Sequence, residues 1–559
     1  MPAEAEVRVY TAKKILTMEP SLPVATAVAI EGDRIVAVGD MESMKDWLET
    51  LPHRVDERFA DKVLLPGLID NHLHPIMAGI LLPMEFVTPF DWDLPGREVV
   101  GVRGHDAYLS RVREILAEQE ESEEPLFVWG YHPIFHGPLS RSDLDEISDS
   151  RPIIAWHRSF HEIYTNTPGL EWLGITQQRA SEYENIDFET GHLWESGLGP
   201  AFQTLGPILL APDRIASGLE QMRKVVHRGG ITTIADMATG LFDIETEWQA
   251  MSRVLEQPET PFRTYLVPDG RQLRETLGSQ GAFNLIQELR ARNSRRLRFL
   301  RAVKFYADGA FFSQLMQLGP PGYMDGHEGE WLMEPDDLLQ AVQPYWNNGY
   351  QLHVHANGDE GVRVTLNVLN EILDIHPRFD HRFTLHHLGY STVAQARRAK
   401  ALGALVSANP FYLFALGDAY ARVGLGPERA SQLVRLGALV REGVPVSLHS
   451  DFTMAPAEPL RLVEIAVTRK SESGKVLAPE ERLTVEQALR AVTIDAAYAL
   501  EVDDMIGSIA AGKKADFTIL DADPTAVSPD EIGSIDVWGT IFEGQVFPLA
   551  PKPRKTDMP

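Results

Sequence analysis

Apolar stretches of strand length alternate with helical stretches through the middle of this 559-residue chain, and this alternation constrains its fold more than any other feature. Helical stretches lie at 338–348, 362–376 and 394–403, each after an apolar run. Strand–helix units repeated in this way predict an α/β fold, a TIM-type (β/α)8 barrel, with its chemistry at the C-terminal strand ends. The expected strands are 63–74, 231–236, 263–267, 301–308, 350–356, 382–388, 403–408 and 444–451.

Both ends of the chain have the pattern of short β-strands joined by tight turns. The segment IEGDRI has a Gly32-Asp33 turn between apolar runs, and 536–547 has a second such turn at Glu543-Gly544. We therefore expect the two ends of the chain to build one small sheet domain, and the sequence between them to form the barrel. The predicted parts are a composite β-sandwich domain of 1–66 plus 500–550, a barrel of 67–499 and a disordered tail of 551–559.

Residues 85–215 separate the first two expected strands by far more than a strand–helix loop requires. The segment has strand-like pieces of its own, LFVWGYH and PIIAWHR, and it holds five of the ten tryptophans. We expect an insertion after the first barrel strand that caps the barrel mouth.

Composition excludes several classes of partner and chemistry. Basic residues number 52 and acidic residues 80, and the net charge of −28 repels nucleic acid and anionic membranes. Cysteine is absent, which excludes disulfides, thiolate ligands and a cysteine nucleophile. The N-terminal residues lack the apolar core of a signal peptide, and no apolar run approaches membrane-spanning length, so we expect a cytoplasmic protein.

Polar residues gather at the ends of four of the expected strands. Alternate side chains of a strand point to the same face, so each of these segments turns a polar face one way and an apolar face the other. A lone histidine at a strand end is more often hydrogen-bonded structure than a ligand, and the prediction rests on the combination. Imidazoles with a carboxylate suit a divalent metal at a hydrolytic centre. The residues are His72 and His74, Lys304, His353 and His355, and His449 and Asp451.

These segments carry a family resemblance. GLIDNHLHP, VKFYADGA, HANGD, HSD followed by APAEPL, and GSIAAGKKADFTILDADP resemble motifs of the amidohydrolase superfamily. Within it, the chain resembles the YtcJ-like branch (amidohydrolase family 3), which includes N-substituted formamide deformylase. The likeness runs from about residue 7 to residue 547.

The resemblance implies a role for each metal ligand. His72 and His74 would bind one metal, and His355 and His387 a second, with zinc the expected ion. Lys304 would be N-carboxylated and bridge the two. A bridging water would attack the substrate carbonyl, and Asp451 would be a metal ligand and the general base that passes a proton to the leaving nitrogen. Some members work with one metal and an unmodified lysine, so the sequence leaves the number of ions open.

Two points about the histidines stay open. His386 and His387 are adjacent, and neighbouring strand residues face opposite ways, so only one is expected to point inward. Strict alternation groups His386 with the polar Thr384, whereas the family match favours His387 as the ligand and leaves His386 where the family usually has glutamate. His353 and His449 share faces with expected ligands and are candidates for hydrogen-bonding the ligands or contacting substrate.

Substrate contacts are expected in the insertion. In SFHEIYTN, His161 is a candidate for polarising the substrate carbonyl, and its alternative is a buried histidine that holds the insertion together. An aromatic-lined pocket is the second expectation, although core packing is the more frequent role for each tryptophan. The candidates for this lining are Trp92, Trp129, Tyr131 and His132.

The leading interpretation is a metal-dependent enzyme that hydrolyses a carbon–nitrogen bond other than a peptide bond. Its substrate would be a small amide, formamide or carbamate-type molecule. The alternatives are an ester or lactone hydrolase, or a decarboxylase or isomerase on the same metal centre. A non-catalytic scaffold is disfavoured because no expected ligand is missing, and the habit of the family suggests a homodimer.

Overall fold

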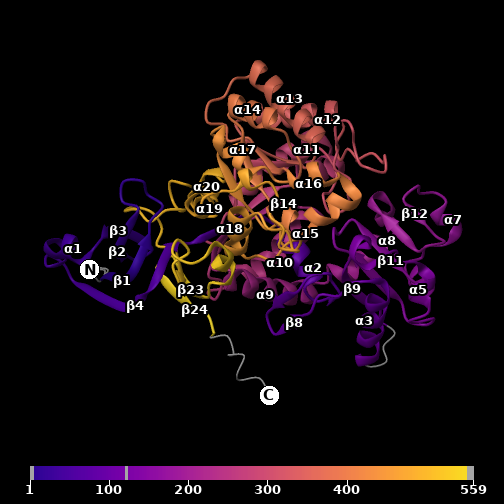
Figure 1. Cartoon of the computed structure of the whole chain (residues 1–559), viewed down its shortest axis with the longest axis horizontal. Helices are drawn as coiled ribbons and strands as arrows, with labels where there is room; N and C mark the ends of the chain where they lie inside the picture. The colour runs from indigo at the N-terminus through magenta and orange to yellow at the C-terminus, as the bar shows by residue number, and fades with distance from the viewer. Residues whose placement is uncertain (1–5, 120–123, 551–559) are drawn as a thin grey trace. The chain divides into compact units, whose positions relative to one another are not determined.

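The computed structural model describes residues 6–119 and 124–550, which form two compact units (Figure 1). One unit holds the described residues of 1–74, 226–247 and 255–559, and the other holds those of 75–225 and 248–254. The tail expected to be disordered, 551–559, lies outside the described residues. Within the described part of the chain, no helix combines the length and apolar character needed to cross a bilayer.

In the first unit, strands from both ends of the chain pair in one seven-stranded sheet with the order β24-β23-β22-β4-β1-β2-β3 (Figure 1). The central pairing is antiparallel and joins β4 to β22, with Leu64 opposite Ile519. Buried Tyr10, Phe59 and Phe517 belong to its apolar core. The strands are β1 Val7–Leu16, β2 Val24–Glu31, β3 Arg34–Gly39, β4 His53–Pro66, β22 Phe517–Leu520, β23 Val537–Phe542 and β24 Gln545–Pro548, and helix α1 is Met41–Leu48.

This unit also contains two sheets of parallel strands. A strand is present at each of the positions expected from the sequence. The parallel strands form a four-stranded sheet in the order β16-β15-β14-β5 and a five-stranded sheet in the order β17-β18-β19-β20-β21. Ile69, Tyr265 and Ala302 from both sheets share one apolar cluster with helix α20. The strands are β5 Leu68–Leu73, β14 Ile231–Thr239, β15 Arg263–Pro268, β16 Leu297–Phe299, β17 Ala302–Tyr306, β18 Gln351–Ala356, β19 Thr384–His387, β20 Leu405–Ala408 and β21 Val446–Leu448.

Helices follow most of these strands. The apolar residues of these segments recur at helical spacing, so each helix can bury one face. In α13, for example, the buried residues Val362, Leu366 and Leu369 fall on one face. The helices are α10 Ile244–Leu255, α11 Gly270–Leu289, α12 Pro335–Asn347, α13 Asp359–Ile375, α14 Val393–Leu402, α15 Phe411–Ala419, α16 Pro427–Ser431, α17 Leu436–Arg441, α18 Pro459–Thr468, α19 Val485–Ala491 and α20 Ile494–Ala499. A π-helix spans Tyr420–Gly424, and 3-10 turns span Arg290–Arg292, Pro479–Glu481 and Pro529–Ser534.

The single strand expected at 63–74 is in fact two strands. β4 ends at Pro66 and pairs with β22, whereas β5 begins at Leu68 and pairs with β14 in the parallel sheet. Gly67 lies at the change of sheet, where a Cβ atom would come within 1.9 Å of the Thr232 hydroxyl oxygen. Only glycine allows this close approach, and the Pro-Gly pair was the sequence signal for the break.

The second unit contains a six-stranded sheet with the order β12-β13-β11-β10-β9-β6 and a hairpin of β7 and β8. Its core includes Tyr108, Val128 and Ile153. The strands are β6 Glu85–Phe86, β7 Trp92–Leu94, β8 Arg97–Val99, β9 Leu126–Tyr131, β10 Ile153–His157, β11 Glu162–Thr165, β12 Ile186–Asp187 and β13 His192–Trp194. The helices are α2 Pro75–Leu81, α3 His105–Glu118, α4 Pro133–His136, α5 Arg141–Asp145, α6 Thr167–Trp172, α7 Gln177–Ala180, α8 Leu198–Leu209 and α9 Pro212–Arg228, with a 3-10 turn at Glu195–Gly197.

A buried ion pair joins the parallel strands to the terminal sheet of the first unit. Arg263, at the start of β15, donates from Nη1 to Asp516 Oδ2 at 2.5 Å, and both side chains are less than 5% exposed. Glu543 Oε1 lies 3.5 Å from Nη2 of the same guanidinium. Breaking a buried pair is costly because it leaves an uncompensated charge away from water.

We predict that Asp516→Ala lowers the free energy of unfolding by about 3 kcal/mol, because Arg263 stays buried without its nearest carboxylate. Urea denaturation of the purified chain measures the change. The control is Asp213→Ala, which removes an exposed partner of Arg253 and should change stability by less than about 1 kcal/mol. Equal shifts for the two variants would contradict the prediction.

Candidate metal centre

Three side chains from two strand ends place their ligand atoms within 4.8 Å of one another: His72, His74 and Asp451. His72 and His74 come from the end of β5, and Asp451 follows β21. Asp451 Oδ1 lies 3.2 Å from His74 Nε2 and 3.6 Å from His72 Nε2. Two imidazoles and a carboxylate at these distances are a donor set that divalent zinc and similar ions accept.

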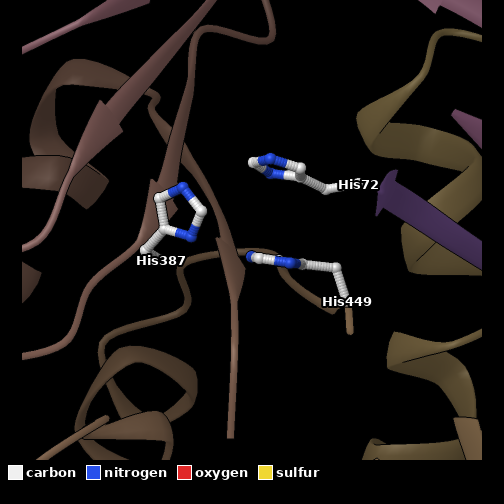
Figure 2. Close-up of side chains that lie close together, drawn as sticks. All are labelled: His72, His387 and His449. Carbon is white, nitrogen blue, oxygen red and sulfur yellow. The ribbon is translucent and has the colours of Figure 1, made fainter. Parts of the chain in front are cut away.

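A second group shares His72 and adds His387 and His449, again with ligand atoms within 4.8 Å (Figure 2). The three rings come from the ends of β5, β19 and β21 and converge in Figure 2. The His72 and His449 rings stack with centroids 4.5 Å apart. His355, at the end of β18, lies beside this group, with its ring centroid 4.4 Å from that of His387.

Hydrogen bonds between strand ends hold this arrangement. The Asp451 amide donates to the His72 carbonyl at 3.0 Å, and the Ser450 amide donates to the buried Asp70 carboxylate at 3.1 Å. These contacts join β21 to β5 directly. Asp451 has a φ of +56°, in the left-handed region, so the extended conformation of the strand has ended at this residue.

Lys304 is on β17, where it pairs in register with His353 on β18. Lys304 is 1% exposed, and its Nζ has no hydrogen-bond partner among the described residues. Burial lowers the pKa of Lys304 to about 7, so a large fraction of the amine is uncharged near neutral pH. An uncharged amine can react with carbon dioxide, which is the chemistry that N-carboxylation requires.

The charge states of the neighbouring groups also fit a bound cation. Burial lowers the pKa of His72 and His387 well below the usual range, and neutral imidazole is the ligand form. Burial acts the same way on His74, but the carboxylates of Asp236 and Asp451 outweigh it and raise its pKa to about 9. Burial would raise the pKa of Asp451, yet His74 lowers it overall. The His74 ring therefore carries a proton near neutral pH, and a metal ion that bound its nitrogen would displace that proton.

The structure corrects the expectation that only one of His386 and His387 can point inward. Both rings lie 4.7 Å from the His72 ring, measured between centroids. The reason is the backbone at the end of β19, where His387 has a φ of +79° and the alternation of an extended strand stops. The role of His387 as a metal ligand stays a prediction.

Three contacts to the expected ligands did not follow from the sequence. Asp236, on β14, lies 3.8 Å from His74 Nδ1. Asn357 donates from Nδ2 to His355 Nε2 at 2.9 Å, and the Tyr412 hydroxyl lies 3.2 Å from His387 Nδ1. Asp236 ends the expected strand 231–236 and Asn357 follows the expected strand 350–356, which is the only sequence signal they carried.

The predicted substrate contacts of the insertion belong to the second unit, where each has a contact of its own. Trp92 and Trp129 pack edge to face, and the Tyr131 hydroxyl donates to the Gly137 carbonyl. His132 Nδ1 accepts from the Ile134 amide at the start of α4, and His161 Nδ1 lies 3.0 Å from Glu195. These contacts give the residues structural roles, and their contact with substrate stays a prediction. His353 and His449 are fully buried beside the expected ligands.

Sequence comparison now decides the family. A model of the amidohydrolase family matches residues 60–548. The chain belongs to the amidohydrolase family. This confirms the resemblance seen in its motifs.

Relatives of this amidohydrolase span nearly its whole length. Protein LONG AFTER FAR-RED 3 of Arabidopsis thaliana is 26% identical over 90% of this chain and 85% of its own. Putative amidohydrolase YtcJ of Bacillus subtilis is 22% identical over 93% of this chain and 95% of its own. N-substituted formamide deformylase of Arthrobacter pascens is 22% identical over 95% of this chain and 96% of its own.

A crystal structure of an uncharacterized metal-dependent hydrolase from Pyrococcus horikoshii superposes on this amidohydrolase with a TM-score of 0.72. The match covers 94% of this chain and 99% of the other, at 20% identity. The amidohydrolase therefore has the α/β fold of a metal-dependent hydrolase.

We predict that Zn²⁺ affinity rises about tenfold per pH unit between about pH 6 and about pH 8. The reason is that the pKa of His74 is about 9, so binding in this range must displace one proton from its ring. Chelator-competition titrations at each pH measure the slope. His74→Ala should bind more weakly and lose the slope, and a flat profile in the unaltered chain would contradict the prediction.

Proposed function

We propose that this amidohydrolase cleaves the C–N bond of a small non-peptide amide, formamide or carbamate. The observation that carries the proposal is the convergence of His72, His74 and Asp451 in a chain of this family. The similarity to a protein named N-substituted formamide deformylase, over almost the full length of both chains, supports a formamide or a related amide. The similarity to metal-dependent hydrolases supports hydrolysis as the reaction.

The proposed ligands are His72, His74 and Asp451 for one ion and His355 and His387 for a second. Zinc is the proposed metal, since imidazole and carboxylate donors suit it. An N-carboxylated Lys304 would supply the bridge between two ions, and its buried, partly neutral amine supports this modification. Divalent metal bound here would lower the pKa of water and polarise a carbonyl group.

Asp451 is the proposed general base. Its pKa is lowered, so its carboxylate is ionised and able to accept a proton from the attacking water. The same group would pass that proton to the leaving nitrogen as the C–N bond breaks. Hydrogen bonding of its own amide to the His72 carbonyl keeps this carboxylate beside the ligands, so that no reorganisation is needed during the reaction.

The proposal includes a fold in which the two parallel sheets close into a (β/α)8 barrel. An isolated parallel bridge between Asp269, which follows β15, and Lys304 on β17 supports closure, because these two strands belong to different sheets. A second part of the proposal is that His161 and the aromatic residues Trp92, Trp129 and Tyr131 of the insertion contact substrate.

We predict that Asp451→Asn lowers hydrolysis by about 100- to 10,000-fold, because asparagine cannot accept the proton. The amide oxygen can still ligate metal, so most bound metal is retained. Amine release from a panel of N-substituted formamides, amides and carbamates measures the loss, and elemental analysis measures the metal. Asp213→Asn, an exposed substitution, is the control.

Near-normal turnover by Asp451→Asn would remove this residue from the proton-transfer role. Turnover of esters or lactones alone would replace the proposed C–N hydrolase with an ester hydrolase. Product formation without hydrolysis would indicate a decarboxylase or an isomerase.

We predict that protein incubated with ¹³C-bicarbonate and Zn²⁺ shows a carbamate carbon signal in NMR spectra, carried by Lys304. The buried amine is partly neutral and can take up carbon dioxide. Lys304→Met should remove the signal, whereas Lys513→Met should keep it, although burial also lowers the pKa of Lys513. An unchanged signal in Lys304→Met would place the modification elsewhere.

A further inference from the structure

Three buried histidines from three strands, one of them the candidate ligand His72, are joined by hydrogen bonds. His386 on β19 places Nε2 at 2.8 Å from His353 Nδ1 on β18. Its other nitrogen, Nδ1, lies 2.8 Å from His72 Nδ1 on β5. All three side chains are at most 1% exposed, so water does not compete for these contacts.

We propose that His386 is a positioning residue that fixes the tautomer of His72 in its metal-binding form. The inference rests on the proposed assignment of His72 as a ligand. Under this proposal, His386 Nδ1 is the acceptor for the Nδ1 proton of His72.

The protons of the three hydrogen-bonded histidines can be arranged in two ways. Each 2.8 Å nitrogen–nitrogen contact needs one proton between its two nitrogens, and a neutral His386 ring supplies only one N–H. In the first arrangement, His72 Nδ1–H donates to His386, and His386 Nε2–H donates to His353. In the second, both hydrogen bonds run the opposite way, and the remaining proton of His72 is on Nε2.

Only the first arrangement allows His72 to bind metal. It leaves a lone pair on His72 Nε2, which is the atom 3.6 Å from Asp451 Oδ1 and therefore faces the carboxylate of the candidate site. The second arrangement covers that nitrogen with hydrogen. An acceptor at Nδ1 also makes the ligand nitrogen more basic, as partners of metal-bound histidines do.

The neighbouring ring of His449 restricts the alternative of rotating His72. His449 stacks on His72 with centroids 4.5 Å apart and an interplanar angle of 18°. Turning the His72 ring by 180° about its Cβ–Cγ bond would place Cδ2 where Nδ1 lies and break the 2.8 Å contact to His386. His449 and His386 therefore both restrict the orientation of His72, and the contact to His386 restricts its tautomer.

Two substitutions separate positioning from packing. His386→Phe keeps a planar ring of similar shape but removes both hydrogen bonds. His386→Gln is a poorer match in shape, but its amide oxygen can accept from His72 and its NH₂ group can donate to His353. If His386 acts only through packing, His386→Phe should bind Zn²⁺ more tightly than His386→Gln. If it positions His72, His386→Gln should bind Zn²⁺ more tightly than His386→Phe.

The experiment measures Zn²⁺ affinity of the full chain by competition with a chromogenic chelator. His386→Phe should weaken binding about 10- to 100-fold, and His386→Gln should recover most of that loss. The control is His136→Phe in the second unit, where His136 is also buried and bonded through both nitrogens, to the His132 amide and the Val102 carbonyl. Zn²⁺ affinity should be unchanged in this control.

A spectroscopic readout tests the proton positions themselves. In the Zn²⁺-loaded protein labelled with ¹⁵N-histidine, His386 should be protonated at Nε2 and unprotonated at Nδ1. The resonance of His386 is identified by its loss in His386→Gln. The opposite tautomer would overturn the proposal, because His72 would then be unable to donate to it.

Binding of Zn²⁺ by His386→Phe at the unaltered affinity would overturn the positioning role, and so would a weaker affinity for glutamine than for phenylalanine. The proposed function fails differently, by an absence of amine release in a chain whose Zn²⁺ affinities follow the expected order. Circular dichroism spectra of each variant establish that the changes in affinity arise in folded protein.

Discussion

Burying a cluster of ionisable groups at strand ends is the constraint on which the rest of this structure depends. Imidazoles, a lysine and a carboxylate lie together out of water, and each would be costly there without partners. Their burial holds most of the imidazoles neutral, and the His74–Asp451 contact pairs the charges that remain. The parallel strands provide the geometry, since their C-terminal ends meet at one edge.

Backbone conformation at two strand ends adapts the sheet to this cluster. His387 and Asp451 have φ values of +79° and +56°, which ordinary strand residues avoid. Such conformations cost about 1 to 3 kcal/mol each and persist where surrounding contacts hold them. Here the holding contacts are the Asp451 amide to the His72 carbonyl and the hydroxyl of Tyr412 beside His387. The same two backbone conformations occur where the side chains of His387 and Asp451 meet the other residues of the cluster.

The sequence was informative about strands and much less so about contacts between them. Apolar runs at 231–236, 263–267, 350–356 and 403–408 predicted β14, β15, β18 and β20 to within a few residues, because each run is bounded by turn residues. The rule of alternating faces failed at His386 and His387 because it applies only while a strand remains extended. Tyr412 and Asp236 approach ligands that are distant in the chain, and no local pattern encodes such a meeting.

The seven-stranded sheet has a consequence for how this polypeptide emerges from the ribosome. Strand β4 is made long before its antiparallel neighbour β22, because Leu65 on β4 pairs with Thr518 on β22, 453 positions later in the chain. Until β22 is made, one side of β4 therefore lacks its backbone partner. Unpaired strand edges invite association with other polypeptides. The nascent molecule must keep that edge protected until β22 has been synthesised.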